Sequence, residues 1–355
     1  MGRAFGARME LATAFLFLAV IPVGLPAALK IATGFGHALF DLTPLRELLV
    51  QLATLGLMLL LGQRPARASG LVQTAIAVLI TATVVSVWWR GGLPRESQAL
   101  LPVTNLEWQA IPAALAVMFW CFVGIEAFTH LGEEFRHPQR DFPLALLAGV
   151  LLAGLVYWGA SVAVLSFGTY GDEQGNATSL PQLLTLLWGD GLSWLAALIG
   201  YLACFASINI YLQGFARLVW SLADEGKLPR ALALRNGQGV PARALALVTA
   251  GCGCFVLLSW WQSLSIEELI RYANGNFVLV YLLSMATGCV LLRGVWRLLA
   301  AISTLLCGLT LALLGIQMLY ALGLLALFLV LGRVWPSGLF APGRRSYRES
   351  RGTLP

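Results

Sequence analysis

Uninterrupted apolar runs repeat along the whole sequence, and many are long enough to cross a bilayer. Crossing a hydrocarbon core of roughly 30 Å takes about 20 helical residues. Because that core holds no water, a spanning segment must be a helix or part of a closed β-barrel. The runs are continuous rather than alternating, which favours helices. Only 11% of the residues are charged, against about 25% in soluble domains. We therefore expect an all-α, polytopic membrane protein.

Ten transmembrane spans are predicted. Arg3 and Arg8 precede the first apolar run, as in a signal peptide, but this run is too long for the apolar region of such a peptide. Residues 1–333 form the predicted transmembrane domain, and 334–355 a polar cytoplasmic tail. The predicted spans are 9–37, 45–62, 71–89, 110–130, 143–167, 192–222, 242–261, 272–292, 297–315 and 317–333.

The basic residues determine the expected orientation. Of the 23 Lys and Arg residues, Arg46, Arg90, Arg95 and Arg271 lie in outer loops and Lys30 lies within a span, which leaves 18 on the inner side. The ammonium group of Lys30 is expected to snorkel outward. We predict a bacterial inner-membrane protein with both termini in the cytoplasm. The basic residues form no stripe of the kind that binds nucleic acid, so no such partner is expected.

The sequence offers no metal or cofactor site. All six cysteines fall within apolar runs without paired spacing, and the three histidines are dispersed. No paired acids or nucleophile–base pair is evident near a membrane face. We therefore expect no cofactor, and we favour a protein that is not an enzyme.

The segment MFWCFVGIEAFTHLGEEFRHPQRDFP, residues 118–143, places the acid Glu126 deep inside a predicted span. Burying a charged group there costs at least about 2.5–3.5 kcal/mol, which indicates a functional residue. Gly124 weakens the helix two residues earlier, and a broken helix exposes backbone groups that can bind a substrate or an ion. An apolar environment favours the neutral carboxyl, which suits a group that takes up and releases a proton. Alternatively, Glu126 lies near a span end and reaches water.

Aromatic side chains flank this predicted break. Trp120 and Phe122 are candidates for stacking on or closing over a substrate, although aromatic residues in spans more often pack or anchor at the interface. The following charged stretch, residues 132–143, is either a solvated turn or an ionic latch on the inner gate.

Polar side chains recur in two later spans. Ser207, Asn209 and Tyr211 lie in the sixth span, and Asn274 and Asn276 lie at the start of the eighth. Such groups either form interhelical hydrogen bonds or contact a substrate.

Two motifs resemble the APC superfamily of amino-acid transporters. WCFVGIEAFTHLGEEFRHPQRDFPLAL is similar to that family's sixth helix, with its F-x-G-x-E break, and FARLVWSLADEGKLP is similar to the end of its eighth. The resemblance implies a LeuT-like fold, in which two inverted five-helix repeats hold the substrate between the broken first and sixth helices. It also implies that residues at the sixth-helix break, together with an eighth-helix aromatic, line the site. By position these are Trp120, Phe122, Gly124, Ile125, Glu126 and Tyr211.

The chain departs from the family pattern at its start. GRAFGARMELATAFLFLAVIPVGLPAAL, residues 2–29, resembles the loop before the family's third helix and that helix itself. We therefore expect the first repeat to be incomplete, without the first two helices. Either these helices lie upstream of Met1, or the chain is a truncated membrane protein that does not transport.

Together, these features predict a secondary transporter. We expect it to export neutral amino acids such as methionine, leucine, isoleucine and valine by proton antiport through Glu126. The few charges in the membrane part argue against cationic substrates. Importers and exchangers of the same fold remain alternatives. The expected substrate contacts are Trp120, Phe122, Gly124, Ile125, Tyr211 and Asn276.

Overall fold

The computed structural model describes residues 1–37, 40, 42–64, 69–92, 111–124, 137–171, 175–176 and 178–334. Over these residues the chain forms helices and no strand, which confirms the all-α class. The elements are α1 (Gly2–Phe5), α2 (Ala7–Leu18), α3 (Ile21–His37), α4 (Pro44–Gly62), α5 (Ser69–Gly91), α6 (Ile111–Phe122), α7 (Pro138–Phe167), α9 (Ser179–Trp188), η3 (Asp190–Leu192), α10 (Ser193–Asp224), η4 (Arg230–Ala233), α11 (Ala242–Trp261), α12 (Ile266–Leu291), α13 (Val295–Leu313) and α14 (Gln317–Val334).

Eight helices in the described part of the chain are long and apolar enough to cross a membrane, with α2 and α3 counted together over Ala7–His37. The protein is therefore a multi-pass membrane protein. Two further predicted spans correspond to shorter helices. The described part of α6 has 12 residues and stops before 125–136, which lie outside the described residues. The apolar part of α14, Gln317–Gly332, is shorter than a full span.

Local signals explain where several helices begin and end. Thr43 caps α4 by accepting a hydrogen bond from the Arg46 amide, and Pro44 follows at the first helical position. Ser265 and Glu268 form a reciprocal capping box at the start of α12. Gly168 ends α7 in the left-handed conformation, at a φ of 64°.

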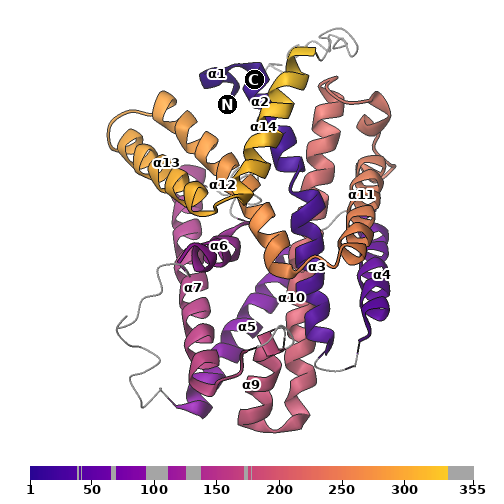
Figure 1. The fold of residues 1–355 in the computed structure, drawn as a ribbon, viewed down its shortest axis with the longest axis vertical. Helices are drawn as coiled ribbons and strands as arrows, with labels where there is room; N and C mark the ends of the chain where they lie inside the picture. The colour runs from indigo at the N-terminus through magenta and orange to yellow at the C-terminus, as the bar shows by residue number, and fades with distance from the viewer. Residues whose placement is uncertain are drawn as a thin grey trace, which may run out of the picture.

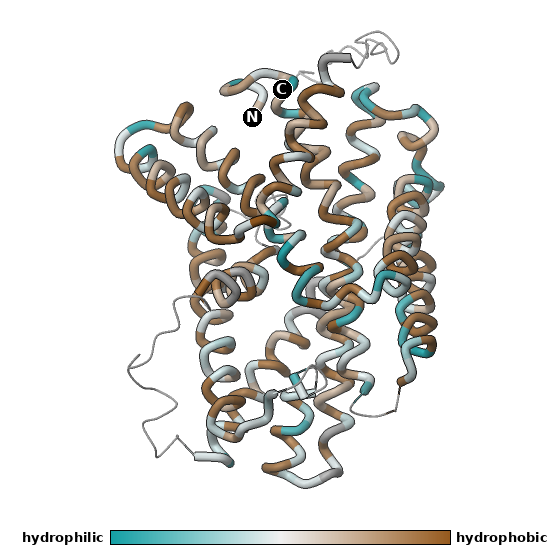
Figure 2. The backbone as a smooth tube through the Cα atoms, viewed as in Figure 1, coloured by the Kyte–Doolittle hydropathy of each residue, from teal (hydrophilic) through white to brown (hydrophobic). Residues whose placement is uncertain are grey.

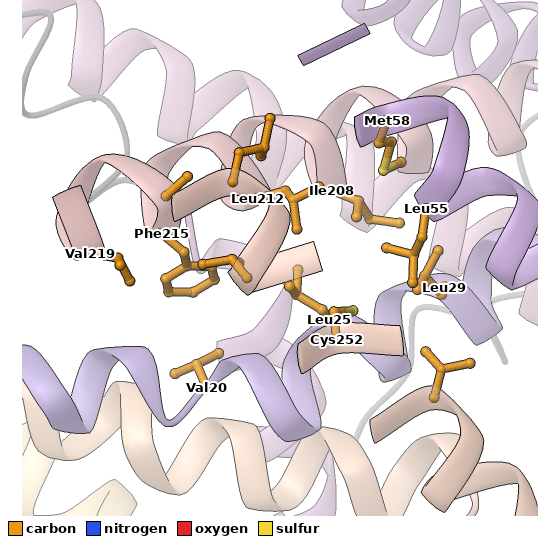
Figure 3. Packing of buried hydrophobic residues seen from close by; sticks show 14 of the residues in the cluster. Val20, Leu25, Leu29, Leu55, Met58, Ile208, Leu212, Phe215, Val219 and Cys252 are labelled. Atoms are coloured by element: carbon orange, nitrogen blue, oxygen red, sulfur yellow. The ribbon is translucent and has the colours of Figure 1, made fainter. Parts of the chain in front are cut away.

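The main core lies where α3, α4, α10 and α11 meet (Figure 3). Leu29, Met58, Leu212 and Cys252, one from each helix, are fully buried there. Apolar helices gain little by leaving lipid for one another, so close packing rather than water exclusion holds these four together. This group of helices forms the scaffold beside which the candidate site lies.

Hydrophobic residues predominate along most of the helices (Figure 2). Leu60, Leu305 and Ile316 are among the many large apolar side chains left exposed, at 67%, 74% and 76%. A soluble protein rarely exposes so much apolar surface, but a lipid-facing surface requires it. Figure 2 also shows a hydrophilic stretch in α12, where that helix lies beside α3.

Several helix ends share one end of the bundle. In Figure 1, α2 begins, α10 ends, α11 begins and α14 ends at the upper end. Placing the start of α2 and the end of α14 on one side is what an even number of spans requires. That this side is cytoplasmic stays a prediction from the distribution of basic residues.

Candidate functional site

Helix α6 ends just before the glycine at which the sequence predicts a break. Its last residue is Phe122, and the Val123 amide donates to the Trp120 carbonyl at 3.2 Å in a tightened turn. Gly124 follows at a φ of 131°, a conformation that favours glycine. A Cβ atom at Gly124 would lie 3.4 Å from the Tyr211 hydroxyl of α10. The end of α6 and the middle of α10 are therefore neighbours.

A second break separates α2 from α3, within the single span predicted over 9–37. Pro22 has no amide hydrogen, and the Val23 amide donates to Val20 at 3.1 Å rather than to Ala19. The Ala19 carbonyl thereby leaves the helical ladder. It accepts a hydrogen bond of 2.9 Å from the side-chain amide of Asn276 on α12.

Asn276 is fully buried at this second break. Its side-chain nitrogen donates to the Ala19 carbonyl. Its side-chain oxygen Oδ1 accepts no hydrogen bond of good geometry from the described residues. The Tyr320 side chain of α14 lies within hydrogen-bonding reach of the same amide group. A buried acceptor without a geometrically good donor is costly and often marks a place for a ligand or water.

Phe277, next to Asn276, lies at the centre of an aromatic cluster. Its ring centroid lies 6.4 Å from Trp120 of α6, 6.3 Å from Tyr211 of α10 and 6.0 Å from Phe17 of α2. The Trp120 ring also reaches α3, 3.7 Å from where a Cβ at Gly24 would be. Four predicted site residues, namely Trp120, Gly124, Tyr211 and Asn276, are thus gathered around Phe277.

Phe122 points elsewhere. Its ring meets Tyr157 of α7 edge-on at 5.4 Å, and the Tyr157 hydroxyl donates to the Cys121 carbonyl at 2.7 Å. That carbonyl belongs to the last turn of α6, where no amide of the same helix can reach it. Phe122 and Tyr157 therefore fix the end of α6 against α7, and Phe122 is not part of the cluster around Phe277. The last two predicted residues, Ile125 and Glu126, lie outside the described residues.

The sequence reasoning missed a polar network between α3 and α4. Oε1 of Glu47 accepts hydrogen bonds from the Gln51 amide at 2.9 Å and the Thr33 hydroxyl at 3.1 Å. The Gln51 amide also lies 3.2 Å from the Thr33 hydroxyl oxygen. His37 Nε2 lies 3.9 Å from the other Glu47 oxygen.

One turn further along α4, the Thr54 hydroxyl lies 2.6 Å from that of Tyr201 on α10. Glu47, Gln51 and Thr54 recur at spacings of four and three, so they share one face of α4. This spacing was visible in the sequence and could have revealed the polar face.

The partner of Lys30 was not predicted. Its ammonium group donates to the Leu264 carbonyl at 2.7 Å, in the turn before α12. Lys30 thereby ties α3 to the α11–α12 connection. That it also snorkels toward the outer surface stays a prediction.

The arrangement around Phe277 has a defined chemistry. The end of α6 at Gly124 and the break between α2 and α3 supply backbone groups outside the helical ladders. Asn276 supplies a buried amide oxygen, and Trp120, Tyr211 and Phe277 supply apolar ring surface. Such a combination suits a small molecule with one charged or polar end and an apolar side chain.

A comparison with protein families identifies a match to the amino acid permease family over residues 4–338. Among curated proteins, the chain is similar to the L-methionine/branched-chain amino acid exporter YjeH of Escherichia coli K12, with 50% identity over 326 residues. The matched region covers 92% of this chain and 78% of that relative.

More distant relatives include an uncharacterised amino acid permease, YecA of Bacillus subtilis, at 27% identity over 78% of this chain. The cadaverine/lysine antiporter of Escherichia coli K12 is 26% identical over 62% of this chain. The matched regions cover 66% and 50% of these two relatives, less than two thirds of each.

Proposed function

The chain belongs to the amino acid permease family, and from this premise we propose that it is a secondary transporter that exports neutral amino acids across the bacterial inner membrane. The candidate substrates are methionine, leucine, isoleucine and valine. The observation that carries the proposal is that the end of α6 at Gly124 and the break at Ala19–Val20 meet around one aromatic cluster. The similarity to an exporter of such amino acids supports the same direction of transport.

Two parts of the proposed substrate, its ammonium group and its apolar side chain, have matching groups. The ammonium group of the substrate can only donate hydrogen bonds, so it is expected near backbone carbonyls at the α2–α3 break and near Asn276 Oδ1. This oxygen accepts no hydrogen bond of good geometry from the described residues. The apolar side chain is expected against Trp120, Tyr211 and Phe277. Gly124 lies at the end of α6, and Ile125, which follows it in the sequence, is expected to contact the substrate. Phe122 supports the end of α6 through Tyr157.

Proton coupling is assigned to Glu126, two residues after Gly124. Inside a membrane span, the neutral form of a carboxyl group costs less free energy than the charged form. Protonation of Glu126 and binding of the substrate can therefore be linked. Antiport then couples the entry of a proton to the exit of an amino acid. The binding site is reached alternately from the two sides of the membrane as one group of helices moves against the other.

Exchange or import by the same fold is the second candidate. A relative whose printed name is an antiporter favours exchange, although it is only 26% identical. Direction depends on the coupling and on the gradients, so it must be measured.

The deciding experiment uses cells fed with a methionine-containing dipeptide, which fills the cytoplasm with methionine by hydrolysis. Cells that express the full chain should hold a smaller methionine pool and release more methionine than cells with an empty vector. A matched variant, Trp120→Ala, should return the pool to the vector level. A pool that rises on expression would indicate import and overturn the export proposal; an unchanged pool in cells with confirmed membrane expression would overturn transport of methionine.

A further inference from the structure

A cavity of about 180 Å³ lies between the end of α4, the C-terminal part of α10 and the start of α11. Its polar lining includes Arg64, Gln213, Arg217 and Gln238, and its apolar lining includes Leu245. A water molecule occupies about 30 Å³ of liquid, so this space can hold a group of several heavy atoms.

The cavity is cationic. Two guanidinium groups and no acid line it, among the residues that the structure describes. Neither Arg64 nor Arg217 forms an ion pair with a described carboxylate. Glu225, the residue that follows α10, pairs instead with Lys227 at 2.6 Å. Planar guanidinium groups bind phosphate oxygens through two parallel hydrogen bonds, so the lining matches that anion well.

The start of α11 adds to this charge. Pro241 and Val240 line the cavity immediately before α11, whose first turn has no acidic residue. The positive end of the helix dipole therefore acts on the cavity without a neighbouring carboxylate to offset it. A 20-residue helix placed beside two guanidinium groups reinforces their attraction for an anion.

Asn236 fixes the connection that completes this wall. Its side-chain oxygen accepts from the Gln238 and Val240 amides at 3.0 Å each, and its side-chain nitrogen donates to the Gln63 carbonyl at 3.0 Å. The connection before α11 is thus tied to the end of α4. The cavity is formed in advance of any ligand, which lowers the entropic cost of binding.

The depth of the two arginines matches that of lipid headgroups. α10 has 32 residues and is therefore about 48 Å long, roughly 9 Å longer at each end than the hydrocarbon core. Arg217 precedes the last residue, Asp224, by seven positions, or about 10 Å. Arg64 follows the last residue of α4, Gly62, by two positions. Both guanidinium groups therefore lie near the boundary between hydrocarbon and headgroups.

From this geometry we propose that the cavity binds the phosphate group of an anionic phospholipid. Basic pockets between transmembrane helices bind such headgroups, and here the phosphate would bridge α4, α10 and the start of α11. The site is separate from the proposed transport site. Residues 211 and 213 lie about 200° apart around α10, so Tyr211 faces the aromatic cluster whereas Gln213 faces this cavity.

The test measures lipid binding to the purified full chain by native mass spectrometry. The probes are phosphatidylglycerol, phosphatidylcholine with the same acyl chains, and inorganic phosphate as a competitor. The wild type should retain phosphatidylglycerol in preference to phosphatidylcholine. The double variant Arg64→Gln/Arg217→Gln should lose roughly tenfold or more of its affinity for phosphatidylglycerol. The charge-matched control Arg293→Gln/Arg297→Gln, in exposed residues near the α12–α13 turn, should change it by less than about twofold.

Equal losses in the two double variants, or an unchanged affinity in the cavity variant, would overturn the proposal. Arg64→Lys/Arg217→Lys keeps the charge and should keep most of the binding of phosphatidylglycerol. If this variant does not bind the lipid although its melting temperature in phosphatidylcholine equals that of the wild type, the result would count against the site. Displacement of phosphatidylglycerol by millimolar inorganic phosphate would show that free phosphate shares the site. Retention under that competition would show that the acyl chains contribute.

Discussion

The side-chain amide of Asn276 donates a hydrogen bond of 2.9 Å to the Ala19 carbonyl, across 257 positions of sequence. This contact joins α12 to the break between α2 and α3, where the Val23 amide, the usual donor to Ala19, bonds the Val20 carbonyl instead. It therefore replaces a bond that the helix does not make. One prediction depends on it directly.

The first concerns Asn276 itself. Asn276→Ala leaves the Ala19 carbonyl without its partner, and an unpaired buried backbone group costs about 1–3 kcal/mol. The apparent melting temperature of the purified protein should fall, and methionine efflux should be lost. Asn209→Ala is the matched control, because Asn209 accepts only a long bond of 3.3 Å from Gln213 on its own helix. Equal effects of the two variants would argue against a special role for the Ala19 contact.

The second prediction concerns the conformation of Gly124. Gly124→Ala forces a side chain into a φ of 131°, which costs about 1–3 kcal/mol in such sparsely populated regions. Efflux should fall strongly even though the new Cβ would meet Tyr211 at an ordinary 3.4 Å. Since backbone strain rather than contact causes the loss, adding Tyr211→Phe should not restore activity. Gly149→Ala, with open space around a helical glycine of α7, serves as the control and should be close to neutral.

The sequence predicts the end of α6 at Gly124 better than it predicts the break between α2 and α3. The end of α6 at Gly124 was predictable because a glycine and an acid interrupt an apolar run within three residues. The break after Leu18 carried a signal too, in the closely spaced Pro22, Gly24 and Pro26, but its apolar surroundings concealed it within one long span. Hydropathy identifies spans well but is insensitive to a proline that bends a helix without adding polarity.

Contacts between distant segments were not predictable. Nothing local indicates that Asn276 bonds to Ala19, that Phe277 lies at the centre of the aromatic cluster, or that Lys30 bonds to Leu264. These depend on how α3, α6, α10 and α12 pack. Phe122 illustrates the same limit, since its position beside the break suggested a substrate contact but its ring packs against α7.

The third prediction concerns proton coupling. Glu126→Gln mimics the protonated carboxyl permanently, so efflux should lose its dependence on pH while folding remains intact. The measurement is methionine transport in vesicles across a range of imposed pH gradients. Glu10→Gln, at an exposed acid of α2 that lies 4.0 Å from Lys227, should keep the wild-type pH dependence. An unaltered pH profile in the Glu126 variant would remove this residue from the coupling mechanism.

The last prediction distinguishes the members of the polar network between α3 and α4. Gln51 is buried and its amide donates to Glu47 at 2.9 Å, so Gln51→Leu leaves Glu47 with one fewer donor in an apolar setting. An unpaired polar group of this kind costs about 1–3 kcal/mol, and the melting temperature should fall measurably. The His37–Glu47 pair is longer, at 3.9 Å, with both side chains about one quarter exposed. Since partly exposed ion pairs contribute about 0–1 kcal/mol, His37→Gln should have little effect. A larger loss of stability in His37→Gln than in Gln51→Leu would mean that the ion pair, rather than the amide, holds α3 against α4.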